Sequence, residues 1–289
     1  MNLKHILIPV DFSLPVLAAA ADARKLASQP GTRITLLHVR QGAGGQGGAA
    51  TGPASKEDWI AGATGGDAVR VAQGLESILT GLSVQQHVLQ GDPAEKIVEY
   101  AREAGVDVII MPTRGVGTVR RFLLGSVTAK VLHDVDCPVW TVVHDMKIED
   151  DATSPALRRV ACAIDLGPES ERILRWASDF AGQFEAALTV IHASPQLEPI
   201  LGVVHDPEWR ASVGAVLRER IGKLNTDTGV SAEVKLVGGE PGKAVSAAAG
   251  ELKADVLVIG RPAANRFLGR LRTNAYAIIQ HSPCAVVSV

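Results

Sequence analysis

The second half of this sequence repeats the first half, and this repetition limits the fold more than any other feature. Five segments recur in the same order, each displaced by 147 to 154 residues. A fixed order at a nearly constant spacing indicates a duplicated structural unit. The matching segments are residues 5–11 and 160–165, 34–39 and 188–193, 90–97 and 238–245, 105–110 and 253–258, and 136–142 and 283–289. We therefore expect two similar domains, over residues 1–145 and 157–289, joined by a polar, acidic linker over residues 146–156.

Each unit alternates short apolar segments with amphipathic ones. Apolar, β-branched runs such as residues 106–110 are typical of strands buried on both faces of a parallel sheet. Pro93 and Pro241 predict helix starts, where the missing N–H of proline costs nothing. Apolar side chains also recur at helical spacing, at Ala68, Val69, Ala72, Leu75, Ile78 and Leu79, and at Val213, Val216, Leu217, Ile221 and Leu224. The pattern predicts an α/β fold of two tandem doubly wound parallel sheets, each with five strands and four helices.

Composition excludes several classes of protein. The chain has 289 residues, of which 46% are hydrophobic and 21% charged, which is typical of folded domains. A formal net charge of -2 disfavours nucleic-acid binding through bulk charge, because that function needs a basic surface. No apolar run approaches the roughly 18 residues of a membrane span, and the N-terminus resembles a strand start more than a secretory signal. The three cysteines, Cys137, Cys162 and Cys284, form no C-x-x-C pair, which predicts free thiols and a cytoplasmic protein.

The first unit contains a candidate anion site. Ligands of open parallel sheets bind beyond the carboxyl ends of the strands, where the strand order reverses. The first strand ends at Asp11 and the fourth near Met111, so both face one crevice if these strands are neighbours. In the loop that follows, Gly115 lets backbone approach an anion, and Arg114, Arg120 and Arg121 add positive charge. The crevice is therefore expected to hold a negatively charged ligand.

Residues 125–128, with the sequence Gly-Ser-Val-Thr, open the last helix of this unit. Free N–H groups and the helix dipole at such a start favour a phosphate. The hydroxyls of Ser126 and Thr128 are further candidate donors.

Two motifs give the first unit a specific resemblance. After the fourth strand, the pattern G-x2-G-x9-G-[S/T] is matched from its second glycine, with nine residues between Gly115 and Gly125. After the first strand, residues 9–13 read P-x-D-x-S. The chain resembles the universal stress protein (UspA) family, in its tandem two-domain form, over nearly all of both units. This resemblance implies the adenine nucleotide alpha hydrolase-like fold and binding of ATP, with Mg²⁺ as a candidate companion ion.

The resemblance also implies the site residues. Adenosine contacts are expected from Pro9, Val10, Asp11, Val39 and Met111, and phosphate contacts from Gly115, Gly125, Ser126, Val127 and Thr128. We add Arg114 on its charge and its place in the loop. Pro112 stands where the family has its first glycine, and proline has no N–H to give to a phosphate.

The second unit departs further from the motif. Gly260 stands at the position of Pro112, Ala263 replaces the second glycine, and Thr273-Asn274 replace Gly125-Ser126. A β-branched side chain at position 273 would crowd the backbone that should approach a phosphate. Arg272, just before it, is an alternative donor. We expect a degenerate nucleotide loop and a structural or regulatory role for this domain.

Simpler roles remain open for several residues. Asp11 and Asp165 are alternatively N-caps of the helices that follow them. His38 and His192, inside apolar strands, are expected to be hydrogen-bonded core residues. No nucleophile–base pair and no cysteine–histidine metal cluster is recognisable, so slow ATP hydrolysis is the most catalysis that the sequence suggests.

The sequence leaves three functional hypotheses. The first is an ATP-binding stress-response or regulatory protein with no nucleic-acid or membrane partner. The second is a nucleotide-free interaction scaffold, and the third is a weak ATPase. The apolar final strands, near residues 139–143 and 285–289, are expected to pair with each other inside one chain, and a homodimer is also possible.

Overall fold

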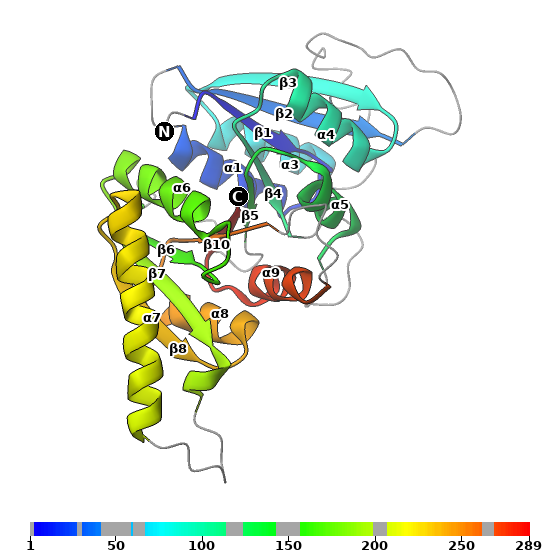
Figure 1. The fold of residues 1–289 in the computed structure, drawn as a ribbon. Coiled ribbons are helices and arrows are strands. Elements are labelled where there is room, and N and C mark those ends of the chain that lie inside the picture. Colours follow the sequence, from blue (N-terminus) through cyan, green and yellow to red (C-terminus); the bar gives the residue numbers. More distant parts are fainter. Residues whose placement is uncertain are drawn as a thin grey trace. The chain divides into compact units, whose positions relative to one another are not determined.

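The computed structural model divides the chain into two compact units. These comprise residues 2–155 and 156–289. The residues that the structure describes are 3–27, 31–41, 59, 67–113, 124–142, 157–198, 207–261 and 269–289. The predicted linker over residues 146–156 lies outside the described residues. Each unit is a domain with its own α/β architecture (Figure 1).

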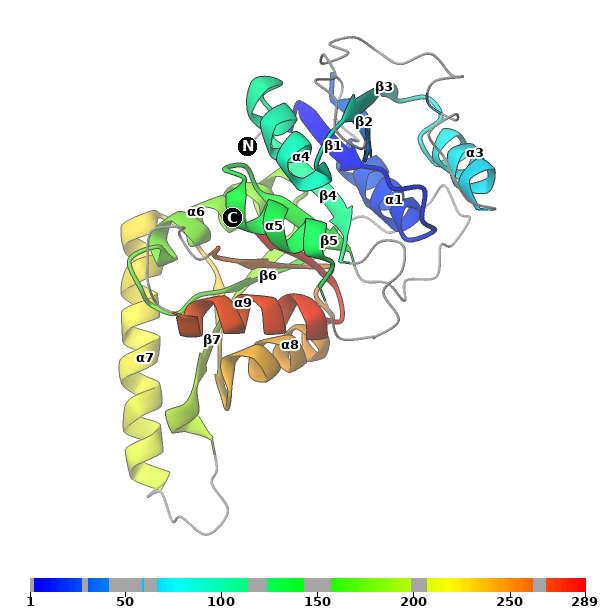
Figure 2. The same ribbon diagram turned by 90° about the vertical axis from the view of Figure 1, so that its right-hand side faces the viewer.

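The first domain is a doubly wound parallel sheet. Its elements are β1 (His5–Pro9), α1 (Val16–Leu26), β2 (Arg33–Arg40), α3 (Ala68–Ile78), β3 (Ser83–Gln90), α4 (Pro93–Glu103), β4 (Val108–Pro112), α5 (Ser126–Asp134) and β5 (Val139–Val142). All pairings are parallel, in the order β3-β2-β1-β4-β5. Helices α1 and α3 cover one face, and α4 and α5 cover the other (Figure 2). The strand order reverses between β1 and β4, as expected.

The second domain repeats this arrangement. Its elements are β6 (Arg159–Ala163), α6 (Ser170–Gln183), β7 (Ala187–Ser194), the 3-10 helix η1 (Pro195–Leu197), α7 (Pro207–Thr228), β8 (Glu233–Gly238), α8 (Pro241–Glu251), β9 (Val256–Ile259), α9 (Gly269–His281) and β10 (Ala285–Ser288). Its strands are parallel, in the order β8-β7-β6-β9-β10. Helices α6 and α7 lie on one face, and α8 and α9 on the other (Figure 2). The tandem α/β fold predicted from the repeat is confirmed.

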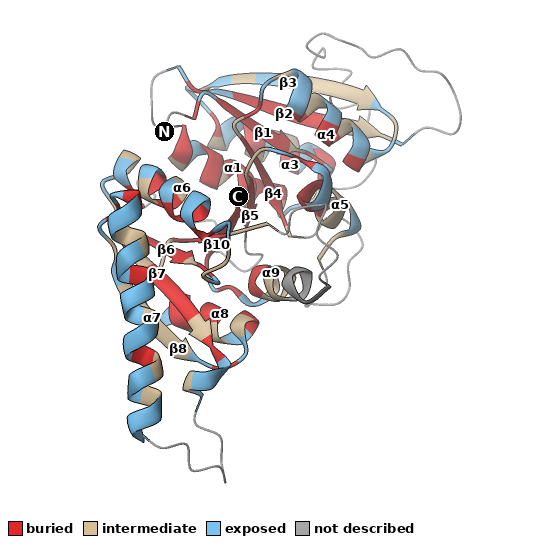
Figure 3. Ribbon diagram, viewed as in Figure 1, coloured by how far each residue is buried: buried red, intermediate tan, exposed pale blue. Residues whose placement is uncertain are grey.

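The central strands form the core of each domain. Ile6, Leu7 and Ile8 of β1 are fully buried, because helices cover both faces of the sheet. The outer strands β3 and β8 are only partly covered, which agrees with their more polar sequences (Figure 3). Among the described residues, no helix combines the length and the apolarity that crossing a bilayer requires.

Equivalent aspartates form the same hydrogen bonds between the starts of the first and fourth strands in both domains. Asp107 accepts hydrogen bonds from the N–H groups of Lys4 and His5, each at 2.8 Å. Asp255 accepts them from Arg158 and Arg159, at 2.7 and 2.8 Å. Each carboxylate thereby ties the start of the first strand of its domain to the residue just before the fourth. The duplication thus extends to individual hydrogen bonds.

The two proline helix starts are confirmed. Asp92 precedes Pro93, and its carboxylate accepts from the N–H of Glu95 at 2.9 Å. Glu240 precedes Pro241, and its carboxylate accepts from the N–H groups of Gly242 and Lys243, at 3.0 and 3.1 Å. Both helices therefore begin with a side-chain acceptor for their free donors.

The three cysteines are free thiols. Burial raises the pKa of Cys162 to about 12 and that of Cys284 to about 11. Both are therefore protonated near neutral pH and behave as small apolar side chains. Cys137 is half-buried.

Candidate functional site

A pocket of about 390 Å³ lies at the carboxyl ends of β1, β2 and β4 in the first domain. It brings together nine of the eleven residues expected from the sequence: Pro9, Val10, Asp11, Val39, Met111, Gly125, Ser126, Val127 and Thr128. The other two, Arg114 and Gly115, lie outside the described residues. The reversal of strand order therefore gathers residues from three separate segments around one cavity.

The sequence did not single out every residue of this pocket. The lining also includes Leu37, His38, Gln41, Pro93, Ile97 and Pro112. Pro93 and Ile97 belong to the first turns of α4, whose start Pro93 predicted. Their contribution to the pocket depends on how α4 packs on the sheet, which no local pattern encodes.

Asp11 closes a turn and does not cap a helix. Its Oδ1 accepts from the backbone N–H and the hydroxyl of Ser13, at 2.9 and 2.5 Å. Helix α1 begins at Val16 with no side-chain cap. The capping expectation is therefore wrong, because the carboxylate reaches the nearer N–H at i+2. The intervening Phe12 has a φ of 58°, in the left-handed region that costs a non-glycine residue about 1 kcal/mol or more.

Asp165 occupies the same place in the second domain. Its Oδ1 accepts from the N–H of Gly167 at 2.7 Å and from the hydroxyl of Ser170 at 3.3 Å. Helix α6 begins at Ser170 without a side-chain cap, so the capping expectation is wrong here too. Leu166 has a φ of 59°, matching Phe12. Both domains thus present an aspartate on a strained turn directly after their first strand.

The two strand histidines are hydrogen-bonded, as expected. His38 Nδ1 contacts the Val10 carbonyl oxygen at 2.8 Å, and His192 Nδ1 contacts that of Ile164 at 2.9 Å. A carbonyl oxygen only accepts, so Nδ1 carries the proton in both rings and the neutral ring offers Nε2 as an acceptor. Both histidines also line the pockets of their domains, which a purely core position would not predict.

The start of α5 supplies backbone donors to the first pocket. The first intrahelical bond runs from the N–H of Ala129 to the carbonyl of Gly125, at 2.8 Å. The N–H groups of Ser126, Val127 and Thr128 precede this bond and so have no acceptor within the helix. All three residues line the pocket. This end of the pocket is suited to an anion, which also interacts favourably with the helix dipole.

The Thr128 hydroxyl already donates a hydrogen bond within the first domain. Thr128 is buried, and its Oγ1 donates to the carbonyl oxygen of Pro112 at 3.1 Å. A hydroxyl has one proton, so it does not also donate to a ligand in this conformation. The expectation that this hydroxyl is a ligand donor is wrong, although its backbone N–H is retained. Ser126 is exposed, and its hydroxyl stays a candidate donor.

A lysine connects the two helices that border the pocket. Lys130 of α5 lies 2.9 Å from Glu95 Oε1 and 3.3 Å from Asp92 Oδ1, both near the start of α4. The hydrogen bond from Glu95 N–H lowers the pKa of Asp92, and the hydrogen bond to Glu95 raises the pKa of Lys130. These groups are exposed, so the link orients α4 and α5 more than it stabilises them.

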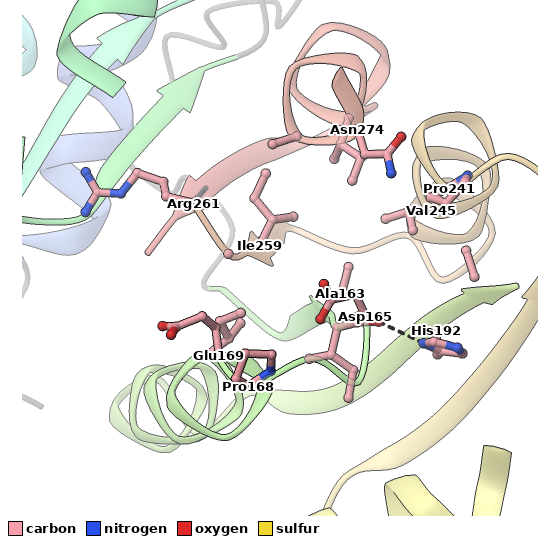
Figure 4. A pocket seen from close by; sticks show the side chains of 16 residues that line it. Ala163, Asp165, Pro168, Glu169, His192, Pro241, Val245, Ile259, Arg261 and Asn274 are labelled. Carbon is pink, nitrogen blue, oxygen red and sulfur yellow. Dashed lines mark hydrogen bonds between the residues drawn. The ribbon is translucent and has the colours of Figure 1, made fainter. Parts of the chain in front are cut away.

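The second domain has a pocket at the equivalent strand ends. Its volume is about 240 Å³. The side chains that Figure 4 labels are Ala163, Asp165, Pro168, Glu169, His192, Pro241, Val245, Ile259, Arg261 and Asn274. Loss of the glycine motif has therefore not removed the cavity, which motif comparison alone did not predict.

Gly260 has a packing role in this domain. A Cβ atom placed on Gly260 would lie 2.5 Å from Cδ1 of Ile173, on α6. Asp11 and Asp165 are equivalent residues of the two domains. Counted from them, Ala19 of α1 corresponds to Ile173 of α6. The helix position that holds Ile173 against Gly260 holds the smaller Ala19 in the first domain, where Pro112 replaces the glycine. Gly260 therefore allows the close packing of Ile173.

The described residues do not group three or more histidine, cysteine, aspartate or glutamate side chains in a way that could hold a metal ion. The predicted loop residues Arg120, Arg121 and Ala263 lie outside the described residues, as do the side chains of Arg272 and Thr273.

Both domains match the same protein-family model. The family model described as "Universal stress protein family" matches residues 2–143 and again residues 156–289. A universal stress protein of Mycobacterium tuberculosis is 30% identical over 136 residues, which are 46% of this chain and 44% of that protein. One of Methanocaldococcus jannaschii is 40% identical over 62 residues, 22% of this chain and 36% of the relative. The chain thus spans about half the length, or less, of the curated relatives it matches.

Solved structures show the same fold. A universal stress protein from Archaeoglobus fulgidus superposes with a TM-score of 0.64 at 24% identity, covering 99% of this chain and 96% of that one. A putative universal stress protein from Pseudomonas aeruginosa gives a TM-score of 0.65 at 20% identity, with 99% and 93% covered. At these identities the similarity concerns the fold.

Proposed function

Because this chain belongs to the universal stress protein family, we propose that its first domain binds ATP and that the chain acts as a stress-response or regulatory protein through that domain's occupied and empty states. The observation that supports this most is one cavity shared by Asp11, Val39 and the free first-turn N–H groups of α5.

The two ends of the first pocket suit the two ends of a nucleotide. Val10, Val39 and Met111 supply apolar surface for a planar base. Asp11 and the Nε2 atom of His38 supply acceptors for amino and hydroxyl groups. The α5 donors take the phosphates, and Pro112 replaces only one of the family's backbone donors. Free thiols also support a cytoplasmic location.

Calorimetry with matched variants tests the proposal. Gly125→Leu places a side chain at the N-cap of α5, where a phosphate must approach, and ATP binding should be lost. Thr273→Leu is the matched change in the second domain and should leave the ATP titration as in wild type. Circular dichroism must show both variants folded. Equal losses in the two variants would contradict the assignment to the first domain.

The interaction scaffold is the main rival, since Pro112 removes a donor. Purified protein is heat-denatured, and the supernatant is read for adenine nucleotide by absorbance and mass. A blank supernatant, followed by no ATP heat in calorimetry, would favour the scaffold.

Weak ATP hydrolysis is tested separately. Turnover is measured with Mg²⁺ in wild type and in Asp11→Ala, because Asp11 is the carboxylate of the first pocket best placed to help hold the ion. Turnover that disappears in Asp11→Ala would favour the weak ATPase.

We also propose that the two final strands, β5 and β10, pair within one chain. Sedimentation equilibrium distinguishes the resulting monomer from a homodimer, and a concentration-dependent dimer mass would require a second interface.

A further inference from the structure

The pocket of the second domain offers hydrogen-bond acceptors at its strand end. His192 is buried, and its Nδ1 donates to the Ile164 carbonyl, which leaves Nε2 as an acceptor (dashed line in Figure 4). Asp165 uses Oδ1 for its turn, and Oδ2 accepts no hydrogen bond within the described part of the chain. A ligand of this end must therefore bring donors, such as amino or hydroxyl groups.

Within the described part of the second domain, the free helix-start donors of the first pocket have no counterpart. Helix α9 has 13 residues and α5 has 9, yet they end at equivalent residues, His281 and Asp134. Helix α9 therefore begins four residues earlier. The N–H groups of residues 273–276 include the counterparts of the free α5 donors, whether the domains are aligned on the glycine motif or on the helix ends. They already lie inside α9, where they bond to carbonyls one turn back. They are not available to an anion.

The charges around this pocket also disfavour a phosphate. Asp165 places its carboxylate among the labelled residues at the centre of Figure 4. The guanidinium of Arg261 extends away from them. Asn274, on α9, is uncharged and lies toward Val245 and Pro241 of α8. Among the described lining residues, an anion would meet the negative charge of Asp165 without a facing cation.

The middle of the cavity is apolar. Val245, Ile259 and Ile278 line it, and Ile173 fills the space above Gly260. These side chains suit the apolar ring body of a ligand.

We propose that this pocket is a second ligand site, which takes an uncharged, nucleoside-like molecule with an apolar ring body and amino or hydroxyl donors, and which rejects phosphorylated forms. The proposal extends the proposed function to the second domain, but it does not require that the first domain bind ATP. The two domains then share the strand-end half of the site and differ at the phosphate half.

The test blocks one pocket at a time. Val39 on β2 and Ala193 on β7 are equivalent pocket-lining residues, one position after each strand histidine. Val39→Phe fills the first pocket, and Ala193→Phe fills the second. Adenosine and ATP are the probes, titrated by calorimetry into the folded full chain. Circular dichroism and thermal melting confirm that each variant is folded.

In Val39→Phe we expect one adenosine per chain, bound at least about tenfold more tightly than ATP. Adding Ala193→Phe to this variant should abolish the adenosine signal. The proposal is overturned if folded Val39→Phe binds no adenosine, if it binds ATP as tightly as adenosine, or if the doubly blocked chain still binds adenosine.

The same titrations separate the two proposals. If wild type binds no ATP while Val39→Phe binds adenosine, the ATP function of the first domain fails and the second site stands. If wild type binds ATP and Val39→Phe binds neither probe, the reverse holds.

Discussion

Trp140 donates a hydrogen bond from its indole Nε1 to Oδ2 of Asp22, at 2.9 Å, inside the first domain. Both residues are buried, and Lys25 Nζ lies 3.1 Å from the other carboxylate oxygen. The bond joins α1 to β5 across 118 residues of sequence. A buried carboxylate is tolerated here because it has both an indole and an ammonium partner.

Replacing Asp22 with leucine should lower the free energy of unfolding by about 1–3 kcal/mol, because the indole N–H is left without an acceptor. Asp22→Asn retains an oxygen and should lose less. Urea titration followed by tryptophan fluorescence measures both. Asp179→Leu, at an exposed position of α6, serves as the control. Equal stability of the Asp22→Leu variant and wild type would show that the hydrogen bond contributes nothing net.

The Thr128 and Ser126 hydroxyls should separate stability from binding. Thr128→Val removes the hydrogen bond to the Pro112 carbonyl and should cost about 1 kcal/mol of stability, with ATP affinity nearly unchanged. Ser126→Ala should leave stability unchanged and weaken ATP binding by about tenfold, the effect of one hydrogen bond to a charged group. Thermal melts and calorimetry measure the two quantities. The opposite pattern, with ATP binding lost in Thr128→Val, would show that the Thr128 hydroxyl contacts the nucleotide.

His5 should make the first domain sensitive to acid. Burial lowers the pKa of His5 below its usual 6.5, and the adjacent Arg33 lowers it further. The unfolded chain therefore takes up a proton that the folded chain resists, so stability is lost as pH falls below about 6.5. Urea titrations at pH 7 and pH 5 should show a larger loss in wild type than in His5→Gln.

Burial also lowers the pKa of His87, so both chains in that experiment should carry His87→Gln. This background removes a second contribution of the same sign. If the two chains then lose stability equally between pH 7 and pH 5, His5 is not the acid-sensitive group.

Gly260 and Ile173 should be energetically coupled. Gly260→Ala introduces a Cβ atom into space that Ile173 occupies, and it should cost about 1–3 kcal/mol. In an Ile173→Ala background the added methyl group has room, and the same change should cost little. A double-mutant cycle by urea denaturation measures the coupling. Additive losses would show that the two residues do not compete for this space.

The sequence predicted the strands, two helix starts and their order, because local residue patterns and the internal repeat indicate these features. Apolar β-branched runs predicted the strands, Pro93 and Pro241 predicted two helix starts, and the repeat supplied the order of the elements. The position of Asp11 at a strand end was sufficient to place it beside the pocket, since parallel strands end at one edge of the sheet.

Other features depend on contacts that close only after folding. The partner of the Thr128 hydroxyl is a carbonyl 16 residues away, and no local pattern indicates it. Asp11 and Asp165 were plausible caps, but their side chains reach a nearer N–H. The second pocket was not predicted because its lining combines apolar residues with polar ones from separate segments and retains no glycine motif.

The early start of α9 has a consequence for engineering. Restoring the glycine pattern in the second domain, for example by Thr273→Gly, changes side chains but leaves the backbone donors of residues 273–275 inside a helix. A graft of the first domain's loop must also shorten α9 by about one turn. The two copies differ in where their last helix begins, and side-chain substitution alone does not move that boundary.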